Sequence, residues 1–359
     1  MIQRLAWGLL LLGLASCASP PTPDPLSSPL PRGELGAHGL APEPWPEALA
    51  EIRERALRVD SLIVTKAGEV VAEYGRSPHT PTTLHDMRSS TKSVTALLVG
   101  GAIDRGLLTG VDASVADFFP EMTVPASWSS RRLTIEDLLT MRSGLDCNDW
   151  DSKSPGNEEK MYDTSDWLRF FFSIEAVEPA GERFSYCTAG VVVLGEIVAR
   201  ASGRALPEVA QEWLFSPLGI ELARFAQAPK SVTDAGGHLE ISAESLTKIL
   251  LLAMAKGRSG DVQVISEPYV EAMLRPHTSL VPRDRPGPRY GYLFWLEPVV
   301  DGVVRSFQTR GNGGQYAIAL PELDATITFT GHAYNDTEEQ SKFFEIAQRR
   351  LIPWLRGDS

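Results

Sequence analysis

The stretch Ser89-Ser90-Thr91-Lys92-Ser93-Val94-Thr95-Ala96-Leu97-Leu98 decides how this chain of 359 residues is interpreted. From Val94 to Ala102 the apolar residues return at the spacing of one face of a helix. We therefore predict a buried helix that begins at Ser89 and in which two consecutive glycines allow close packing. At the N-terminus of such a helix, free N–H groups and the helix dipole favour developing negative charge.

Lys92 lies one turn after Ser89 and faces the same way. Beside a buried helix, the pKa of its ammonium is expected to be lowered, which would suit it to proton transfer from the serine hydroxyl. The alternative is that Ser89 only caps the helix and that Lys92 is exposed, and the residues alone do not separate the two. A second Ser-x-x-Lys, from Ser245 to Lys248, lies inside a helix that Ser242 begins. We predict that this second pair is structural and lies on a solvated face.

Two further segments carry residue types that acyl-transfer chemistry uses. In Phe184-Ser185-Tyr186-Cys187-Thr188 the tyrosine precedes a predicted buried helix. A tyrosine in such a place is ordinarily a core residue, but beside a lysine its phenol can act as a general base. Arg310-Gly311-Asn312-Gly313-Gly314-Gln315 leads into a strand. Its glycines indicate a bulge or turn, or they let a backbone N–H approach a ligand as an oxyanion donor must.

Composition and missing motifs narrow the function classes. The net charge of −12 and the absence of a basic run argue against nucleic-acid binding. Three cysteines without Cys-x-x-Cys exclude a zinc ribbon and a thioredoxin-type pair. Neither Gly-x-Ser-x-Gly nor His-Glu-x-x-His occurs, and the six histidines are scattered singly, so no metal site is expected. We predict an enzyme that needs no metal and no organic cofactor.

Residue patterns place strands at both ends of the domain and helices between them. A hairpin is predicted over Ser61–Tyr74, and further strands are predicted over 290–296, 303–309, 315–320 and 325–330. Helices are predicted over 45–57, 134–144, 190–201, 242–256 and 337–355. This order favours an α+β fold whose sheet joins the two ends of the domain, with a helical region inserted.

The N-terminal segment has the features of an export signal. Residues 1–16 hold one arginine and an apolar run that is too short to span a membrane. The run ends in Leu14-Ala15-Ser16-Cys17, which resembles a bacterial lipobox with Cys17 as the lipidated residue; the alternative is a plain signal cleaved nearby. Residues 17–45 are rich in proline and predict a disordered tether, which leaves 46–359 as the folded domain. We expect a monomer held by this lipid in the bacterial cell envelope, at the outer membrane facing the periplasm.

The motifs Ser89-x-x-Lys92, Tyr186-Cys187-Thr188 and Asn312-Gly313-Gly314, in this order, resemble the serine β-lactamase and penicillin-binding-protein superfamily. The likeness is closest to class C β-lactamases and their esterase and 6-aminohexanoate-dimer hydrolase relatives. It runs from about Arg58 to the C-terminus and includes His85-Asp86-Met87-Arg88 before the serine. The resemblance implies a sandwich of helices around an antiparallel sheet, with an inserted helical subdomain and a cleft between the two.

The resemblance also implies roles for particular residues. Ser89 would attack an ester or amide carbonyl of a small substrate, and Lys92 and Tyr186 would move its proton. The backbone N–H groups of Ser89 and Gln315 would hold the oxyanion. The substrate-binding residues would be Thr188, Arg310, Asn312, Gly313 and Gly314. Cys147 would lie near the same cleft as Cys187, and in an exported chain we predict a disulfide between them, the alternative being two buried free thiols.

Two departures from the family pattern bear on the substrate. Thr188 stands where β-lactam-processing relatives usually have asparagine, and Asn312 stands where they have lysine. These changes argue against β-lactamase and D-Ala-D-Ala carboxypeptidase activity, which remain alternatives together with a non-catalytic, envelope-binding lipoprotein. If residues 310–312 are extended, Arg310 lies on the same face as Asn312 and would replace the missing charge. Specificity is expected to depend on the loop Asn148–Tyr162.

Overall fold

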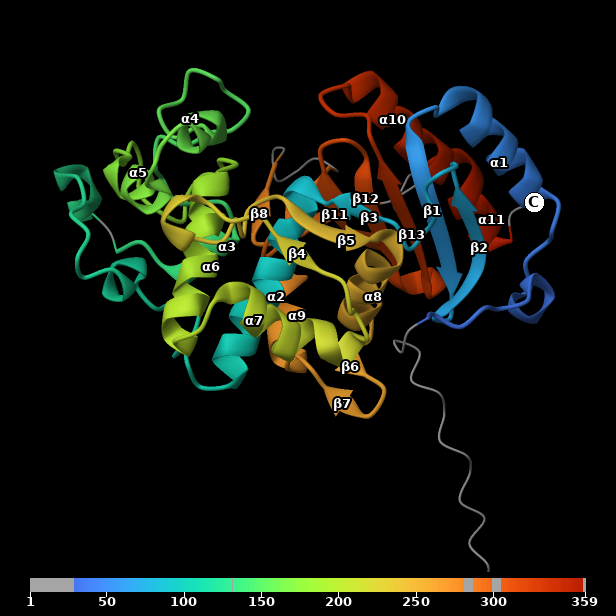
Figure 1. Ribbon diagram of the computed structural model, residues 1–359, viewed down its shortest axis with the longest axis horizontal. Coiled ribbons are helices and arrows are strands. Elements are labelled where there is room, and N and C mark those ends of the chain that lie inside the picture. Colours follow the sequence, from blue (N-terminus) through green and yellow to red (C-terminus); the bar gives the residue numbers. More distant parts are fainter. Residues whose placement is uncertain (1–28, 131, 281–286, 299–304, 358–359) are drawn as a thin grey trace, which may run out of the picture.

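The structure is a computed structural model, which describes residues 29–130, 132–280, 287–298 and 305–357 (Figure 1). The strands are β1 Val59–Lys66, β2 Glu69–Gly75, β3 Leu84–Asp86, β4 Arg224–Phe225, β5 Leu239–Ser242, β6 Arg258–Ser259, β7 Val262–Gln263, β8 Thr278–Ser279, β9 Arg289–Tyr290, β10 Trp295–Pro298, β11 Arg305–Gly311, β12 Gln315–Leu320 and β13 Ala325–Gly331. The helices are α1 Pro44–Arg55, α2 Thr91–Asp104, α3 Ile135–Leu139, α4 Glu158–Tyr162, α5 Trp167–Ser173, α6 Thr188–Ser202, α7 Leu206–Ala210, α8 Ala243–Met254, α9 Glu267–Met273, α10 Thr337–Ile346 and α11 Ile352–Arg356.

The main sheet joins the two ends of the domain, as the sequence predicts. Its strands are antiparallel in the order β2-β1-β13-β12-β11-β10-β9-β8, so the first hairpin pairs with the last strand. Two buried hydroxyl pairs cross this junction, Ser61 with Thr330 at 2.6 Å and Thr65 with Thr326 at 2.7 Å. Each pair satisfies two polar groups that would otherwise be buried without partners.

Helices cover both faces of this sheet, as alternation along β12 shows. Ile318 and Leu320 face an apolar cluster formed with α1, α10 and α11, whereas Ala317 and Ala319 face the cluster that contains α2 and α8. Alternate residues of a strand point to opposite faces. Figure 1 shows α1, α10 and α11 together at one side of the molecule, and α3 to α7 at the other side, where they form the predicted helical insertion.

Two predicted elements are interrupted, one at a left-handed residue and the other at a π-helical turn. The predicted strand 290–296 divides into β9 and β10 because Leu293 has a left-handed backbone (φ 56°) and its N–H donates to the Leu139 carbonyl outside the sheet. The predicted helix 337–355 contains a π-helical turn over Ala347–Leu351. Pro353 follows this turn and cannot donate a helical hydrogen bond.

Residues 29–45 depart from the disordered tether predicted for 17–45. Leu30 is buried and its N–H donates to the Glu244 carboxylate at 2.9 Å. Backbone hydrogen bonds at Pro31 and Gly33 tie this segment to Val70 in β2. The predicted signal peptide and Cys17 lie outside the described residues. Within the described ranges, none of the helices combines the length and apolar character that a membrane crossing requires.

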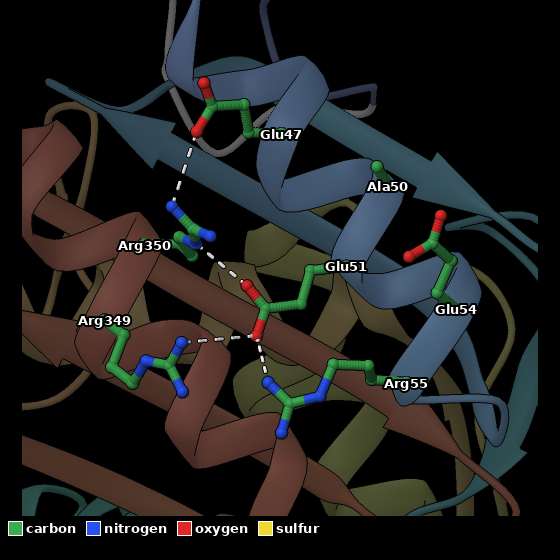
Figure 2. A pocket seen from close by; sticks show the side chains of 7 residues that line it. All are labelled: Glu47, Ala50, Glu51, Glu54, Arg55, Arg349 and Arg350. Carbon is green, nitrogen blue, oxygen red and sulfur yellow. Dashed lines mark hydrogen bonds and ion pairs between the residues drawn. The ribbon is translucent and has the colours of Figure 1, made fainter.

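A surface depression of about 470 Å³ marks where α1 meets the C-terminal helices (Figure 2). Glu51 lies at its centre, where it pairs with Arg55 of the same helix and with Arg350 at 2.8 Å. The hydrogen bond from Arg350 lowers the pKa of Glu51. The depression is lined by ion pairs rather than by any predicted site residue, so we regard it as part of the packing between the two ends of the domain.

Candidate active site

Ser89 lies in a short 3₁₀ turn, Arg88–Ser90, that connects β3 to α2. The helix itself begins at Thr91, two residues later than predicted. Arg88 has a left-handed backbone (φ 47°), which is strained for a residue with a side chain and is often found at functional sites. Ser89 remains partly exposed. The turn therefore presents the serine hydroxyl at the surface while α2 behind it is buried.

Polar side chains of the turn and of α2 hold this part of the chain in place. Ser90 donates to the Gln315 carbonyl, Ser93 to the Leu293 carbonyl and Thr95 to the Ala235 carbonyl, each at 2.7 Å. A Cβ added at Gly100 would come within 2.5 Å of the Tyr269 ring, which explains the close packing predicted there. Since three different segments hold the helix, Ser89 has little freedom to move relative to them.

Lys92 reaches back to the serine. Its Nζ lies 3.0 Å from Ser89 Oγ and 2.5 Å from the Gly236 carbonyl oxygen, and its side chain is buried. The alternative in which Lys92 is exposed is therefore wrong. A neighbouring turn keeps Gly236 in position, because the buried Asp234 carboxylate accepts the N–H groups of Gly236 and Gly237 at 3.1 and 2.9 Å.

The expected lowering of the Lys92 pKa is wrong in direction. Burial works to lower this pKa, but the electrostatic interactions with Tyr186, which becomes charged only as it ionises, and with the carboxylates of Glu158, Asp149 and Asp234 together outweigh burial and raise it. An ammonium flanked by acidic groups holds its proton more tightly. Lys92 is thus a buried cation at neutral pH, and its electrostatic field acts on the groups beside the serine.

Tyr186 is one of those groups. The Lys92 Nζ lies 5.1 Å from the centre of its ring, and Ser89 is its hydrogen-bond partner. Burial raises the pKa of Tyr186, although the Lys92 charge and the Ser89 hydrogen bond partly offset this effect. At neutral pH the phenol is therefore mostly protonated, and the arrangement lowers the cost of forming its phenolate.

An aromatic group that the sequence did not reveal surrounds Tyr186. Its ring lies 5.3 Å from that of Trp150 and 6.1 Å from that of Trp295, and the two tryptophan rings are themselves 6.3 Å apart. Phe184 lies within 6.4 Å of Tyr186 and Trp295. Trp150 is 62% exposed. It belongs to the loop Asn148–Tyr162 that was expected to set specificity, whereas nothing in the pattern around Trp295 brings it to this place. These rings give the site an apolar, aromatic wall.

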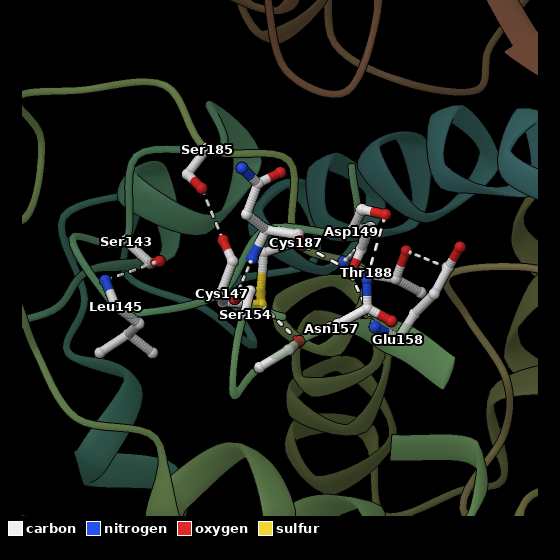
Figure 3. The surroundings of a disulfide bond; sticks show 12 residues. Ser143, Leu145, Cys147, Asp149, Ser154, Asn157, Glu158, Ser185, Cys187 and Thr188 are labelled. Atoms are coloured by element: carbon white, nitrogen blue, oxygen red, sulfur yellow. Dashed lines mark hydrogen bonds between the residues drawn. A yellow bond between two sulfur atoms is a disulfide. The ribbon is translucent and has the colours of Figure 1, made fainter. Parts of the chain in front are cut away.

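Two carboxyl groups that the sequence analysis missed lie beside Lys92. Asp149 accepts the N–H of Glu158 at 2.9 Å and the N–H of Thr188 at 2.7 Å, so it caps the starts of both α4 and α6 (Figure 3). Burial and the charge of Glu158 raise the pKa of Asp149 to about 6. The sequence did contain a pointer to these two acids, since Asp149 and Glu158 both lie in the loop Asn148–Tyr162 that was expected to control specificity.

Thr188 does not take the substrate-binding position that the resemblance implies. Its side chain is fully buried, and its hydroxyl donates to the Glu158 carboxylate at 2.7 Å (Figure 3). Its role in the structure is to hold Glu158 near Lys92.

The predicted disulfide between Cys147 and Cys187 is present (Figure 3). It closes a loop with a sequence separation of 40 residues and joins the segment before Asp149 to the residue after Tyr186. The Asp149 N–H also donates to the Tyr186 carbonyl at 2.9 Å. The carboxylate loop and the tyrosine are therefore connected by one covalent bond and one hydrogen bond.

The two backbone donors predicted for the oxyanion lie on adjoining segments. The Ser90 hydroxyl donates to the Gln315 carbonyl, which joins the turn of Ser89 to the start of β12. The Gln315 side chain is turned away and bonds to the backbone of Gly331 at 2.6 and 3.2 Å. A Cβ at Gly311 would collide with the Met87 carbonyl, so only glycine permits β11 to approach this turn so closely.

Arg310 and Asn312 are engaged with other parts of the protein rather than free for a ligand. Arg310 pairs with Glu297 at 2.6 Å and lies over the Trp295 ring at 5.1 Å. The Asn312 side chain donates to Asn335 at 2.6 Å and accepts from Gln340 at 3.0 Å. The proposed replacement of a missing lysine charge by Arg310 is thus not realised.

Gly313 and Gly314 form the turn before β12. Both have left-handed backbones, with φ of 98° and 93°. A Cβ at Gly313 would come within 2.6 Å of the Tyr334 ring, and one at Gly314 would overlap the Phe343 ring. The left-handed turn and the nearby rings are enough to explain why both positions are glycine. The contact with substrate that was predicted for them is not needed to explain this choice.

Comparisons with known proteins agree with this geometry. The family described as Beta-lactamase matches residues 47–349. The 6-aminohexanoate-dimer hydrolase of Paenarthrobacter ureafaciens is 26% identical over 228 residues, which are 60% of this chain and 57% of that protein. Esterase EstB of Burkholderia gladioli is 31% identical over 196 residues, which are 49% of each chain. The chain thus matches about half the length of these curated relatives.

A solved structure extends the likeness to the whole fold. EstCE1, a hydrolase with promiscuous acyltransferase activity, has a TM-score of 0.70, covers 87% of this chain and 99% of its own, and is 16% identical. At that identity the likeness shows the fold, with its antiparallel sheet and flanking helices. Because the family match covers most of the sequence as well, this chain belongs to the beta-lactamase family.

Proposed function

We propose that the protein is a serine hydrolase that cleaves ester or amide bonds of small substrates through an acyl-enzyme on Ser89. The observation that carries this proposal is the contact of 3.0 Å between Lys92 Nζ and Ser89 Oγ, with Tyr186 as the second partner of the same hydroxyl. A partly exposed serine beside a buried cation and a phenol has the parts that nucleophilic catalysis needs. The relatives named as an esterase and a dimer hydrolase support the same reaction class.

The electrostatics favour Tyr186 over Lys92 as the proton acceptor. Lys92 keeps its proton because acidic neighbours raise its pKa. The reactive form is the fraction in which the Tyr186 phenol has already released its proton to solvent, leaving a phenolate that the Lys92 ammonium stabilises. As Ser89 Oγ attacks the carbonyl carbon, its proton passes to this phenolate. The bond to the leaving group then breaks, and Tyr186 gives this proton to the leaving oxygen or nitrogen. A water molecule next attacks the acyl-enzyme, Tyr186 accepts a proton from it, and the proton returns to Ser89.

A fluorophosphonate probe tests the proposal directly. The probe should form one covalent adduct, which peptide mass mapping places on Ser89. The variant Ser89→Ala should not be labelled, whereas Ser245→Ala, which alters the second Ser-x-x-Lys, should be labelled like the unmodified protein. If the folded protein does not react and hydrolyses none of a series of short-chain esters and amides, the non-catalytic alternative is correct.

We further propose that uncharged esters are better substrates than β-lactams. The carboxylate of a lactam would meet no free cation from Arg310, which Glu297 neutralises, and none from Asn312. A charged hydrogen bond contributes roughly 1.5–3 kcal/mol, so its loss weakens capture of an anion by about 10- to 150-fold. The aromatic wall formed by Trp150, Trp295 and Phe184 supports apolar acyl or leaving groups.

The ratio of kcat/KM for p-nitrophenyl butyrate to that for nitrocefin measures this preference. We expect the ratio to be high in the unmodified protein and to fall in Asn312→Lys, which adds a cation near the start of β12. Asn335→Lys is a matched control, because it adds the same charge at the hydrogen-bond partner of Asn312. Efficient turnover of nitrocefin by the unmodified protein would show that the substrate class is wrong.

We also propose that the chain is anchored by a lipid on Cys17 in the bacterial cell envelope. The support is the sequence before Cys17, together with a structural disulfide of the kind that oxidising compartments maintain. When the full chain is expressed in bacteria fed a labelled fatty acid, the label should appear in the protein and be lost in Cys17→Ser. An unlabelled chain that is recovered outside the membrane fraction would contradict the anchor.

A further inference from the structure

Three of the six histidines, which are scattered in the sequence, converge on one carboxylate in the structure. Asp60 lies in β1 and is 2% exposed. His85 Nε2 lies 3.2 Å from Asp60 Oδ2, His79 Nε2 lies 3.7 Å from Asp60 Oδ1, and His332 Nδ1 lies 2.8 Å from the same Oδ1. Histidines that are scattered singly in the sequence thus lie together here, although their spacing along the chain gave no reason to expect a metal site. None of the reaction steps above uses the cluster.

The surroundings of His85 show what kind of group belongs between it and Asp60. Its Nδ1 lies 3.1 Å from the Thr83 carbonyl oxygen, which can only accept a hydrogen bond, so Nδ1 carries the proton. In the neutral ring, Nε2 then has a lone pair that faces the carboxylate oxygen at 3.2 Å. Two acceptors at this distance repel each other unless a proton or a metal cation lies between them.

The same arrangement is typical of a metal-binding histidine. A ligand histidine usually donates its other ring N–H to a backbone carbonyl or a carboxylate, which fixes the ring and leaves one nitrogen for the metal. His85 does this through Thr83. His79 presents Nε2 to the same carboxylate, and its Nδ1 is buried without a hydrogen-bond partner among the described residues. Its ring lies 5.1 Å from that of His85.

We propose that His79 Nε2, His85 Nε2 and the Asp60 carboxylate form a binding site for a divalent transition-metal cation such as Zn²⁺. Bonds of about 2.0–2.1 Å in tetrahedral geometry place ligand atoms roughly 3.3 Å apart. Both imidazole nitrogens face the Asp60 carboxylate, His85 at 3.2 Å from Oδ2 and His79 at 3.7 Å from Oδ1. One ligand atom from each of the three residues lies within 4.8 Å of the others, so a small movement brings them to these separations. His79 is the ligand that must move, and its partly exposed side chain leaves room for this.

The donor set selects the class of cation. Two imidazoles and one carboxylate suit Zn²⁺, Ni²⁺ or Co²⁺, whereas Ca²⁺ and Mg²⁺ prefer sites made of oxygen alone. His332 contacts Asp60 rather than His85 or His79, so it would orient the carboxylate from outside the site. A water molecule would complete the coordination.

The place of the site indicates a structural role. It joins the start of β1, the loop between β2 and β3, and β3 itself, while His332 connects it to the end of β13. The strand that carries His85 leads into the turn of Ser89 four residues later. A bound cation would therefore hold that strand against the junction of the two chain ends, apart from the reacting groups.

Zinc binding to the purified chain, after dialysis against a chelator, tests the proposal. We expect one Zn²⁺ per chain by elemental analysis, and calorimetry should show that His79→Gln weakens binding by more than 100-fold. His332→Gln should weaken it by about 10- to 100-fold, the range found when an outer-shell partner is lost. His38→Gln is the matched control, because His38 pairs with Glu69 outside the cluster. The affinity of this variant for Zn²⁺ should equal that of the unmodified chain.

The visible absorption of the Co²⁺ form tests the ligand set without any substitution. Tetrahedral coordination by nitrogen and oxygen should give intense d–d bands, which added Zn²⁺ should abolish. The proposal is overturned if His79→Gln and His38→Gln bind Zn²⁺ equally well. It is also overturned if the unmodified chain binds no stoichiometric Zn²⁺ after the dialysis.

Discussion

The two Ser-x-x-Lys segments share a spacing but differ in what surrounds them. Both lysines are buried, with Lys92 1% and Lys248 2% exposed. The prediction that Lys248 lies on a solvated face is therefore wrong, although its role is still structural. It lies 3.8 Å from Glu244, one turn earlier in α8, and donates to the Gly219 carbonyl. Burial of the lysine thus does not distinguish the proposed catalytic pair from a pair that only contributes to packing.

The serines make the difference. Ser245 lies inside the first turn of α8, and its N–H and hydroxyl both bond to the capping Ser242 hydroxyl, at 3.1 and 3.0 Å. Ser89 precedes its helix, follows a strained residue and is partly exposed. A serine outside the helix is free to meet a substrate, whereas a serine that belongs to the cap is already satisfied.

The largest expected effect separates the two serines. Ser89→Ala should reduce ester hydrolysis to the uncatalysed background, because no other hydroxyl would receive the acyl group. Ser245→Ala should keep kcat within about twofold, since it removes only the hydrogen bond between the Ser245 and Ser242 hydroxyls at the start of α8. Steady-state kinetics with p-nitrophenyl butyrate measure both. The comparison fails if the two variants lose activity equally while their circular dichroism spectra stay native.

A smaller effect separates the two lysines. Lys92→Met should lower kcat by roughly 10²–10⁴, the scale of a lost acid–base group, because the Tyr186 phenolate would lose its counter-charge. Lys248→Met should leave kcat unchanged and lower the free energy of unfolding by about 3–5 kcal/mol, because Glu244 would stay buried without its cation. Kinetics and urea denaturation of each variant give the two values. Equal losses of kcat, at unchanged stability, would remove the distinction.

The smallest expected effect concerns the carboxylates around Lys92. As pH rises through about 6, Asp149 ionises, and its charge raises the pKa of Tyr186 and disfavours the phenolate. In Asp149→Asn, the rise of kcat/KM with pH should therefore begin at lower pH and lack an inflection near 6. Asp151→Asn, an exposed acid of the same loop, should retain the original profile.

Stability should change in the same window. The pKa of Asp149 is higher in the folded chain than its ordinary value of 3.8, so the folded state holds the proton more tightly. Folding stability then falls as pH rises from about 4 to 6, and Asp149→Asn should remove this part of the dependence. Urea denaturation at pH 4, 5, 6 and 7 measures the free energy of unfolding across this range. A profile that is identical in Asp149→Asn and Asp151→Asn would contradict the assignment.

Most of the fold could be predicted from local sequence patterns. The buried helix after Ser89, the hairpin of β1 and β2 and the late strands all follow from short-range periodicity. The left-handed residue Leu293, which splits a predicted strand, depends on its bond to Leu139 far away in the chain. Such a tertiary contact cannot be recognised in a single sequence. Leucine is compatible with an extended strand, so nothing in the local pattern indicates the left-handed backbone at Leu293.

The site shows the same limit more strongly. Ser89, Lys92 and the disulfide partners could be predicted because motif order and thiol chemistry are written in the sequence. The sign of the Lys92 pKa shift could not, because it depends on acids such as Asp149 that tertiary folding brings near. Trp295 and the partners of Asn312 and Arg310 were missed for the same reason, since each contact joins segments that are separate in the sequence.

The pairing of β1 with β13 has a consequence for how the chain is made. Val64 in β1 pairs with Ile327 in β13. A strand that is synthesised early therefore cannot form these hydrogen bonds until one of the last strands has been synthesised. Until then its inner edge has no neighbour, and an open edge readily pairs with other chains. Premature stops anywhere before β13 should therefore produce aggregates rather than smaller active proteins, even though Ser89, Lys92 and Tyr186 are all synthesised long before.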